Sequence, residues 1–166
     1  LRRSNSCNRL DVFKRRASLL KETPFLTSKL NHHWFMKIAV IGCGALGSYY
    51  GALLCRSGEE CHFCLRTDYE HVKAHGVEIL SPKGCFHIQP HCHENPVTIG
   101  PCDLVLIGLK TTANPILETW LPPLMGPDTR VLTLQNGLGN EEALTSMVDP
   151  TRILGGLCFV LSLIHI

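Results

Sequence analysis

The chain has 166 residues, which is enough for one domain with a hydrophobic core. Its residues are 45% hydrophobic and 18% charged, a composition that excludes a disordered chain. A net charge of +2 gives no argument for nucleic-acid binding, and no apolar run reaches the roughly 18 to 20 residues that span a bilayer. Neither a nucleic acid nor a membrane is therefore predicted as a partner, while oligomeric state stays open.

Cysteine usage indicates the compartment. The chain has nine cysteines, an odd number, scattered through segments that have strand and helix patterns. Reduced thiols in a cytoplasmic protein are favoured over a disulfide framework.

Both ends of the chain differ from the middle. Residues 1–35 are basic and rich in Ser and Thr, which is typical of either an organelle transit peptide or a non-native leader translated from upstream sequence. The second interpretation is favoured because the chain begins with Leu1 and Met36 directly precedes the first strand pattern. The segment Leu161–Ile166, LSLIHI, resembles a translated sequencing adaptor and is predicted to be an artefactual tail. The predicted domain therefore covers residues 36–160.

The domain begins with a strand, a helix and a second strand. Lys37–Ile41 is a short apolar strand, and Glu60–Leu65 is the next. The pattern between them predicts a helix over Ala45–Arg56 that ends at Gly58. Its expected buried face carries four large side chains: Leu46, Tyr50, Leu53 and Leu54.

Shorter elements follow. Asp68 is expected to cap a helix that runs to about Ala74. Val77–Leu80 and Cys85–Ile88 are predicted strands around a turn at Pro82-Lys83-Gly84. The continuous apolar run Asp103–Leu109 is typical of a strand that is buried on both faces.

The rest of the domain continues the alternation. A helix is predicted over Thr112–Leu121, a strand over Arg130–Leu134, a helix over Asn140–Met147 and a last strand over Arg152–Leu157. Strands that alternate with helices predict an α/β fold, a doubly wound and mainly parallel sheet of Rossmann type.

The glycine-rich turn carries the first functional signal. G-x-G-x-x-G follows a strand and opens a helix, which is the context that makes this pattern specific for a dinucleotide. Gly42 allows the tight turn, Gly44 lets a pyrophosphate approach the backbone, and Gly47 lets the helix pack closely on the sheet. The helix N-terminus then offers N–H groups to the phosphates. The alternative is a packing turn with no ligand.

The residues after the second strand bear on which dinucleotide binds. Arg66 stands where an NAD site has an Asp or Glu for the ribose 2′-hydroxyl, and a guanidinium suits a 2′-phosphate. Asp68 lies two residues further on and is the candidate for an NAD-type acid. NADP(H) is preferred, with Asp68 interpreted as a helix cap.

Two further polar residues follow predicted strands. Lys110 comes after Asp103–Leu109, and Asn136 comes after Arg130–Leu134. An open α/β sheet binds its ligands at the carboxyl ends of its strands. Either residue alone is typical of a turn, but with the glycine turn they indicate a cofactor site.

Together these motifs resemble the N-terminal half of the ketopantoate reductase family. The matching segments are MKIAVIGCGALGSYYGALL (Met36–Leu54), LRTDYE (Leu65–Glu70), LIGLKT (Leu106–Thr111) and LQNGLGNEE (Leu134–Glu142). The resemblance covers about Met36 to Val160. It implies NADPH-dependent reduction of 2-dehydropantoate to pantoate, a step toward pantothenate and coenzyme A.

The resemblance also assigns roles to residues. The turn Gly42, Cys43, Gly44, Ala45, Leu46 and Gly47 would hold the pyrophosphate. Arg66 would hold the 2′-phosphate, Lys110 would lie beside the cofactor, and Asn136 would contact cofactor and substrate as the catalytic-site residue of this half. The family's proton-donating Lys and a substrate-binding Glu belong to a second, all-helical domain that this chain does not include. The 166-residue chain is therefore expected to bind cofactor without useful turnover.

Particular residues raise other chemistries. Cys61 and Cys64 have C-x-x-C spacing, but residues three apart on a strand point to opposite faces, so no metal site is expected there. A second group near the hairpin is expected to be exposed edge residues, with a metal as the alternative: Cys85, His87, His91, Cys92 and His93. Cys43 is expected to act as a small apolar residue.

Two other functions stay open from the sequence. One is a reductase of the same build that acts on a different 2-keto acid. The other is an NADP-binding sensor without chemistry, although Lys110 and Asn136 at the nicotinamide end favour an enzyme.

Overall fold

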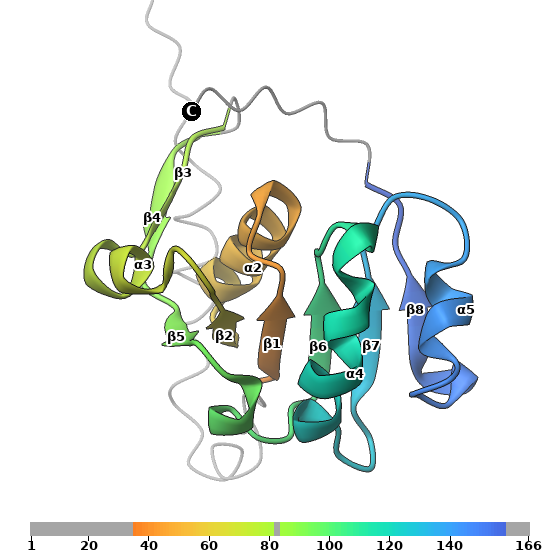
Figure 1. The fold of residues 1–166 in the computed structure, drawn as a ribbon. Helices are drawn as coiled ribbons and strands as arrows, with labels where there is room; N and C mark the ends of the chain where they lie inside the picture. Colours follow the sequence, from red (N-terminus) through yellow and green to blue (C-terminus); the bar gives the residue numbers. More distant parts are fainter. Residues whose placement is uncertain (1–34, 82–83, 159–166) are drawn as a thin grey trace, which may run out of the picture. The chain divides into compact units, whose positions relative to one another are not determined.

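The computed structural model describes residues 35–81 and 84–158. Six strands of this part form one sheet: β1 (Lys37–Ile41), β2 (Glu60–Cys64), β5 (His91–His93), β6 (Leu104–Ile107), β7 (Arg130–Thr133) and β8 (Ile153–Gly155). Their order is β5-β2-β1-β6-β7-β8, and every neighbouring pair is parallel. The predicted Rossmann-like sheet is confirmed, with its carboxyl ends along one edge (Figure 1).

Helices connect these strands. The α-helices are α2 (Ala45–Ser57), α3 (Tyr69–His75), α4 (Leu117–Trp120) and α5 (Asn140–Leu144). Short 3-10 helices are η1 (Pro96–Thr98), η2 (Thr111–Ile116), η3 (Pro122–Leu124) and η4 (Pro150–Arg152). A separate antiparallel hairpin joins β3 (Val77–Ile79) and β4 (Phe86–Ile88), as the turn residues between them predict.

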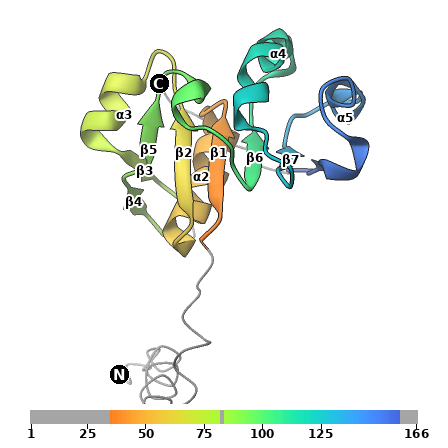
Figure 2. The ribbon, with the colours of Figure 1, turned by 90° about the horizontal axis from the view of Figure 1, so that it is seen from below.

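The sheet is covered on both faces (Figure 2). On one face, Ala39, Val105 and Val131 pack with residues of α4 and α5 such as Leu117 and Leu144. On the other face, strand, α2, α3 and hairpin residues form a second cluster that includes Val40, Phe63, Ala52, Val72 and Ile79. β1 lies at the centre, and its residues Ile38–Ile41 are fully buried, as expected for an apolar strand in a parallel sheet.

The buried face of α2 follows the prediction only in part. Its buried residues are the small ones, Gly47, Gly51 and Ala52. Of the predicted larger side chains, Tyr50 and Leu54 are half-buried and pack against the core, whereas Leu53 is 36% exposed. A Cβ on Gly51 would lie 2.8 Å from the Phe63 ring, so the helix backbone sits directly on the sheet. The hydrophobic pattern selected the larger side chains, but close approach of the backbone decides which face is buried. Gly58 ends the helix in the left-handed conformation at φ 103°, as predicted.

Two other elements were predicted wrongly. Thr112–Leu121 is not one helix but η2 followed by α4, because Pro115 lacks an N–H and restricts the residue before it. β5 was not predicted as a strand. His91–His93 has no apolar alternation, and it is extended because it pairs with β2 at the sheet edge.

Several predicted features concern the ends of the chain. Residues 1–34 of the basic leader and the tail 161–166 lie outside the described residues, so both interpretations remain predictions. Within 35–81 and 84–158, no helix is long and apolar enough to cross a bilayer.

Candidate functional site

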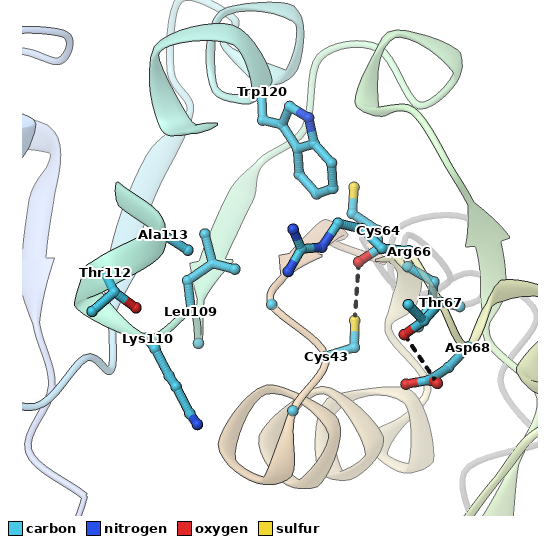
Figure 3. A pocket seen from close by; sticks show the side chains of 14 residues that line it. Cys43, Cys64, Arg66, Thr67, Asp68, Leu109, Lys110, Thr112, Ala113 and Trp120 are labelled. Carbon is cyan, nitrogen blue, oxygen red and sulfur yellow. Dashed lines mark hydrogen bonds between the residues drawn. The ribbon is translucent and has the colours of Figure 1, made fainter. Parts of the chain in front are cut away.

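A cavity of about 310 Å³ opens at the carboxyl edge of the sheet, between the ends of β1, β2 and β6. This volume lies at the lower end of the range for small-molecule sites, about 300 to 1,000 Å³. Figure 3 shows its labelled side chains. The cavity is lined by Gly42, Cys43, Gly44, Cys64, Leu65, Arg66, Thr67, Asp68, Gly108, Leu109, Lys110, Thr112, Ala113 and Trp120.

The protein itself requires three of the glycines around the turn. Gly42 has φ 87°, and a Cβ there would lie 2.5 Å from the backbone nitrogen of Leu109. A Cβ on Gly47 would collide with the carbonyl oxygen of Gly42. A Cβ on Gly108 would lie 2.9 Å from Gly47. These three positions hold the β1 turn, the start of α2 and the end of β6 together.

Gly44 is different, because nothing in the protein requires a glycine there. Its φ is −76°, which any L-residue adopts, and a Cβ would meet no heavy atom within 4 Å. Gly44 is the N-cap of α2, where no side chain caps the helix and no acidic residue lies in the first turn. The first N–H groups of an α-helix lack intrahelical acceptors and carry partial positive charge. The open space above Gly44 therefore suits an anionic group that approaches the backbone.

The surroundings of Cys43 do not favour a role as a nucleophile. Its Sγ lies 3.5 Å from the carbonyl oxygen of Cys64 and 3.6 Å from that of Val40. Burial is the largest cause that raises the pKa of the Cys43 thiol well above its ordinary value, and the neighbouring thiols of Cys64 and Cys92 raise it further. The thiol is thus protonated at neutral pH and ties the turn to the end of β2.

The loop after β2 forms one wall of the cavity with Arg66, Thr67 and Asp68. Asp68 occupies the N-cap position of α3, but its side chain makes no capping hydrogen bond, so that part of the prediction is wrong. Its Oδ1 instead accepts a hydrogen bond from Thr67 Oγ1 at 3.3 Å. Asp68 and Arg66 are both exposed at the cavity.

The other predicted site residues separate into two groups. Lys110 lines the cavity on the side opposite Arg66 (Figure 3). Ala45, Leu46 and Gly47 lie in the first turn of α2, just behind the lining. Asn136 follows β7 and is exposed, but it is not part of the cavity lining. The cavity therefore gathers predicted residues that follow β1, β2 and β6, and not the one that follows β7.

The loop that carries Asn136 is held by a residue that sequence reasoning missed. The buried amide nitrogen of Asn140 lies 3.3 Å from the carbonyl oxygen of Asn136 and 3.0 Å from that of Gly137. On the other side of the loop, Gln135 Nε2 donates to Asn114 Oδ1 at 2.6 Å. An amide at the first position of a predicted helix was the available signal for Asn140.

Sequence reasoning also missed several lining residues: Gly108, Leu109, Thr112, Ala113 and Trp120. The first two directly follow an apolar strand, so their place at the carboxyl edge was available as a signal. Nothing in the sequence marks Trp120, which lies at the end of α4 and reaches the cavity only through the fold.

A histidine cluster lies on β2 and β5, apart from the cavity lining. His62 Nδ1 is 3.0 Å from His93 Nε2, and His62 Nε2 is 2.9 Å from Glu60 Oε1. The His91 ring stacks on His62, and His93 Nδ1 is 2.7 Å from Thr98 Oγ1. Burial is the first cause that lowers the pKa of both His62 and His93.

Among residues 35–81 and 84–158, no group of three or more His, Cys, Asp or Glu is arranged to hold a metal ion. The C-x-x-C pair divides as predicted, with Cys61 in the core of one sheet face and Cys64 in that of the other. Cys85 is exposed, and His87 Nε2 lies 2.7 Å from the carbonyl oxygen of His75.

The sequence pattern of the family described as ketopantoate reductase PanE/ApbA matches residues 38–163. The chain belongs to the ketopantoate reductase family. A 2-dehydropantoate 2-reductase of Nostoc sp. is 43% identical over 127 residues, which are 76% of this chain and 40% of that protein. Among family members of known structure, the 2-dehydropantoate 2-reductase of Geobacter metallireducens is 50% identical with a TM-score of 0.74, over 77% of this chain and 43% of that one.

A second kind of relative has the same fold. D-mandelate dehydrogenase, solved with NADH and anilino(oxo)acetate, is 27% identical to this chain with a TM-score of 0.67 and covers 74% of it. The chain spans about two fifths of the length of the ketopantoate reductases that it matches.

Proposed function

We propose that residues 36–160 bind NADP(H) and serve as the cofactor domain of a 2-dehydropantoate 2-reductase. The observation that carries this proposal is the open space above Gly44 at the uncapped N-terminus of α2, next to Arg66 in one cavity. The cofactor's pyrophosphate would lie on the N–H groups of Gly44, Ala45 and Leu46. When bound, NADPH supplies the hydride that reduces the substrate ketone.

The side chains of the cavity support the choice of NADP(H). Arg66 presents a guanidinium at the end of β2, where the 2′-substituent of the adenosine ribose lies in this fold. A guanidinium pairs with phosphate through two parallel hydrogen bonds, which favours the 2′-phosphate over a hydroxyl. Lys110 adds a second cation across the cavity.

Asp68 favours a second candidate, an NADH-dependent reductase of another 2-keto acid. Its carboxylate makes no capping bond and lines the same cavity, so it is available to a ribose hydroxyl. The likeness to D-mandelate dehydrogenase with bound NADH supports the same alternative. Arg66 lies nearer to the end of β2, and the matched reductases of Nostoc and Geobacter are more similar to this chain, so NADP(H) and 2-dehydropantoate are the first proposal.

The reduction of 2-dehydropantoate is proposed for a full-length protein, which contains the part of the matched reductases that this chain does not cover. Asn136 would contact the cofactor and the substrate beside the nicotinamide, on the β7 side of the cavity. The proton donor would come from the second domain. The 166-residue chain alone is expected to bind cofactor with no measurable turnover. The eight cysteines of the described residues are all unpaired, which supports the proposed cytoplasmic location.

Calorimetric titration of the 166-residue chain with NADPH and with NADH tests the cofactor proposal. We expect NADPH to bind at least tenfold more tightly, because only it carries the 2′-phosphate that pairs with Arg66. Tighter binding of NADH would favour the second candidate, and absence of binding by both would overturn the proposal. A full-length protein supplied with 2-dehydropantoate, and with other 2-keto acids, then tests the substrate.

A further inference from the structure

Trp120 lines the cavity but belongs neither to the glycine turn nor to the charged residues of the lining. It is the last residue of α4 and is half-buried, with part of its ring packed against the core on that face of the sheet. Figure 3 shows its indole ring at the end of the cavity away from the first turn of α2, with the Arg66 side chain between them. No hydrogen bond joins its indole N–H to another described residue.

The cavity has both polar and apolar walls. Its polar groups, Arg66, Asp68 and Lys110, extend from the loops at the strand ends, whereas Cys64 and Leu65 are buried and apolar beside the end of β2. An apolar wall with a flat ring fits a flat and weakly polar ligand group better than it fits a phosphate.

The lining also indicates which half of a dinucleotide the cavity takes. It contains Arg66 and Asp68 after β2 and lacks Asn136 after β7. A ligand with its pyrophosphate at Gly44 and its adenosine ribose at Arg66 has only the adenine base left to place on this side. The wall beyond Arg66 is formed by Trp120.

We propose that Trp120 is a binding residue on which the adenine ring of the cofactor stacks. The inference rests on the proposed function and adds to it the residue that holds the base. Adenine presents a π-face to the indole, and Arg66 reaches the same space from the β2 side, so the base lies between an aromatic ring and a guanidinium. The indole N–H is free to donate a hydrogen bond to a ring nitrogen of the base.

Fluorescence of Trp120 tests the proposal without altering the residue. The chain has two tryptophans, so Trp34→Phe leaves Trp120 as the only indole. The probe is 2′,5′-ADP, which carries the adenine and the 2′-phosphate but no nicotinamide. Because a stacked base changes the emission of the ring, we expect saturable quenching of Trp120 as 2′,5′-ADP is added.

Variants then measure the contribution of the flat ring. Trp120→Leu is expected to weaken 2′,5′-ADP binding about tenfold or more, whereas Trp120→Phe keeps a π-face and is expected to stay within about threefold. Glu118→Gln, an exposed neighbour on α4 outside the cavity lining, serves as the matched control and is expected to bind like the parent chain.

Failure of this inference differs from failure of the proposed function. If the parent chain binds 2′,5′-ADP but Trp120 emission does not change, the stacking proposal is wrong while cofactor binding stands. Equal affinities of the parent and a folded Trp120→Leu chain would likewise show that the ring does not stack on the base. If the parent binds neither 2′,5′-ADP nor NADPH, the proposed function fails and the inference fails with it. The quenching measurement tests the stacking even if Trp120→Leu does not fold.

Discussion

Replacing Gly44 with alanine tests whether the space at the start of α2 is reserved for a ligand. The added methyl group meets no protein atom within 4 Å, and the backbone at φ −76° accepts an L-residue without strain. Alanine is less favourable than glycine at an N-cap, which costs up to about 1 kcal/mol of folding stability. A narrower unfolded ensemble offsets part of that cost, by about 0.4 to 1 kcal/mol. The free energy of unfolding is therefore expected to change by less than about 1 kcal/mol.

The effect on cofactor binding is expected to be much larger. A methyl group on Gly44 fills the space through which a phosphate reaches the backbone, so at least one hydrogen bond to a charged group is lost. Such a bond contributes about 1.5 to 3 kcal/mol, which corresponds to a roughly 10- to 150-fold higher Kd for NADPH. Isothermal titration with NADPH measures the Kd, and urea unfolding of the same sample measures stability.

Gly47→Ala is the matched control with the opposite pattern. Its methyl group would collide with the carbonyl oxygen of Gly42, so the helix must shift away from the sheet. Overpacking of this kind costs about 1 to 3 kcal/mol of stability. If Gly44→Ala binds NADPH within twofold of the parent chain, the assignment of this opening to a pyrophosphate is refuted.

Three further changes test other parts of the site. Arg66→Gln should raise the Kd for NADPH about tenfold or more and leave that for NADH within twofold, as titration would show, because only NADPH has the 2′-phosphate; equal losses for the two would argue against the pairing. Asn140→Asp should lower the free energy of unfolding by about 1 to 3 kcal/mol, since a carboxylate cannot donate to the carbonyl oxygens of the loop after β7; an unchanged urea midpoint would contradict this role. Stability should also fall as the pH drops from about 7 to 5. The lowered pKa values of His62 and His93 mean that the unfolded chain, with ordinary values near 6.5, binds more protons in this range. Replacing both His62 and His93 with Gln should make the free energy of unfolding depend less on pH. If urea titrations of this double variant show the same pH dependence as the parent chain, the two histidines are not its cause.

The parts predicted best from sequence are those where local pattern and tertiary role agree. β1 has the predicted bounds Lys37–Ile41, and the central strands and the helix stop at Gly58 follow from apolar runs and glycine. The turn at Gly42 and Gly47 was interpreted correctly because the close packing it predicts depends only on backbone sterics.

The parts predicted worst depend on partners far away in the chain. β5 is a strand because β2 offers it a free edge, and nothing in His91–His93 signals that partner. The buried face of α2 is set by how closely the backbone of Gly51 approaches Phe63, which hydrophobicity does not encode. Trp120 enters the cavity because η2 and α4 return along the sheet, so its place follows from topology rather than from its neighbours in sequence.

The position of β1 between β2 and β6 has a kinetic consequence. The turn at Gly42 is completed by the backbone of Gly108, whose N–H donates to the carbonyl oxygen of Ile41 at 2.8 Å across a long stretch of chain. Such pairing must await closure of a large loop, which is slow compared with local helix formation. The phosphate-binding turn is thus complete only after the central strands have paired. Added cofactor should lower the unfolding rate and leave the folding rate unchanged.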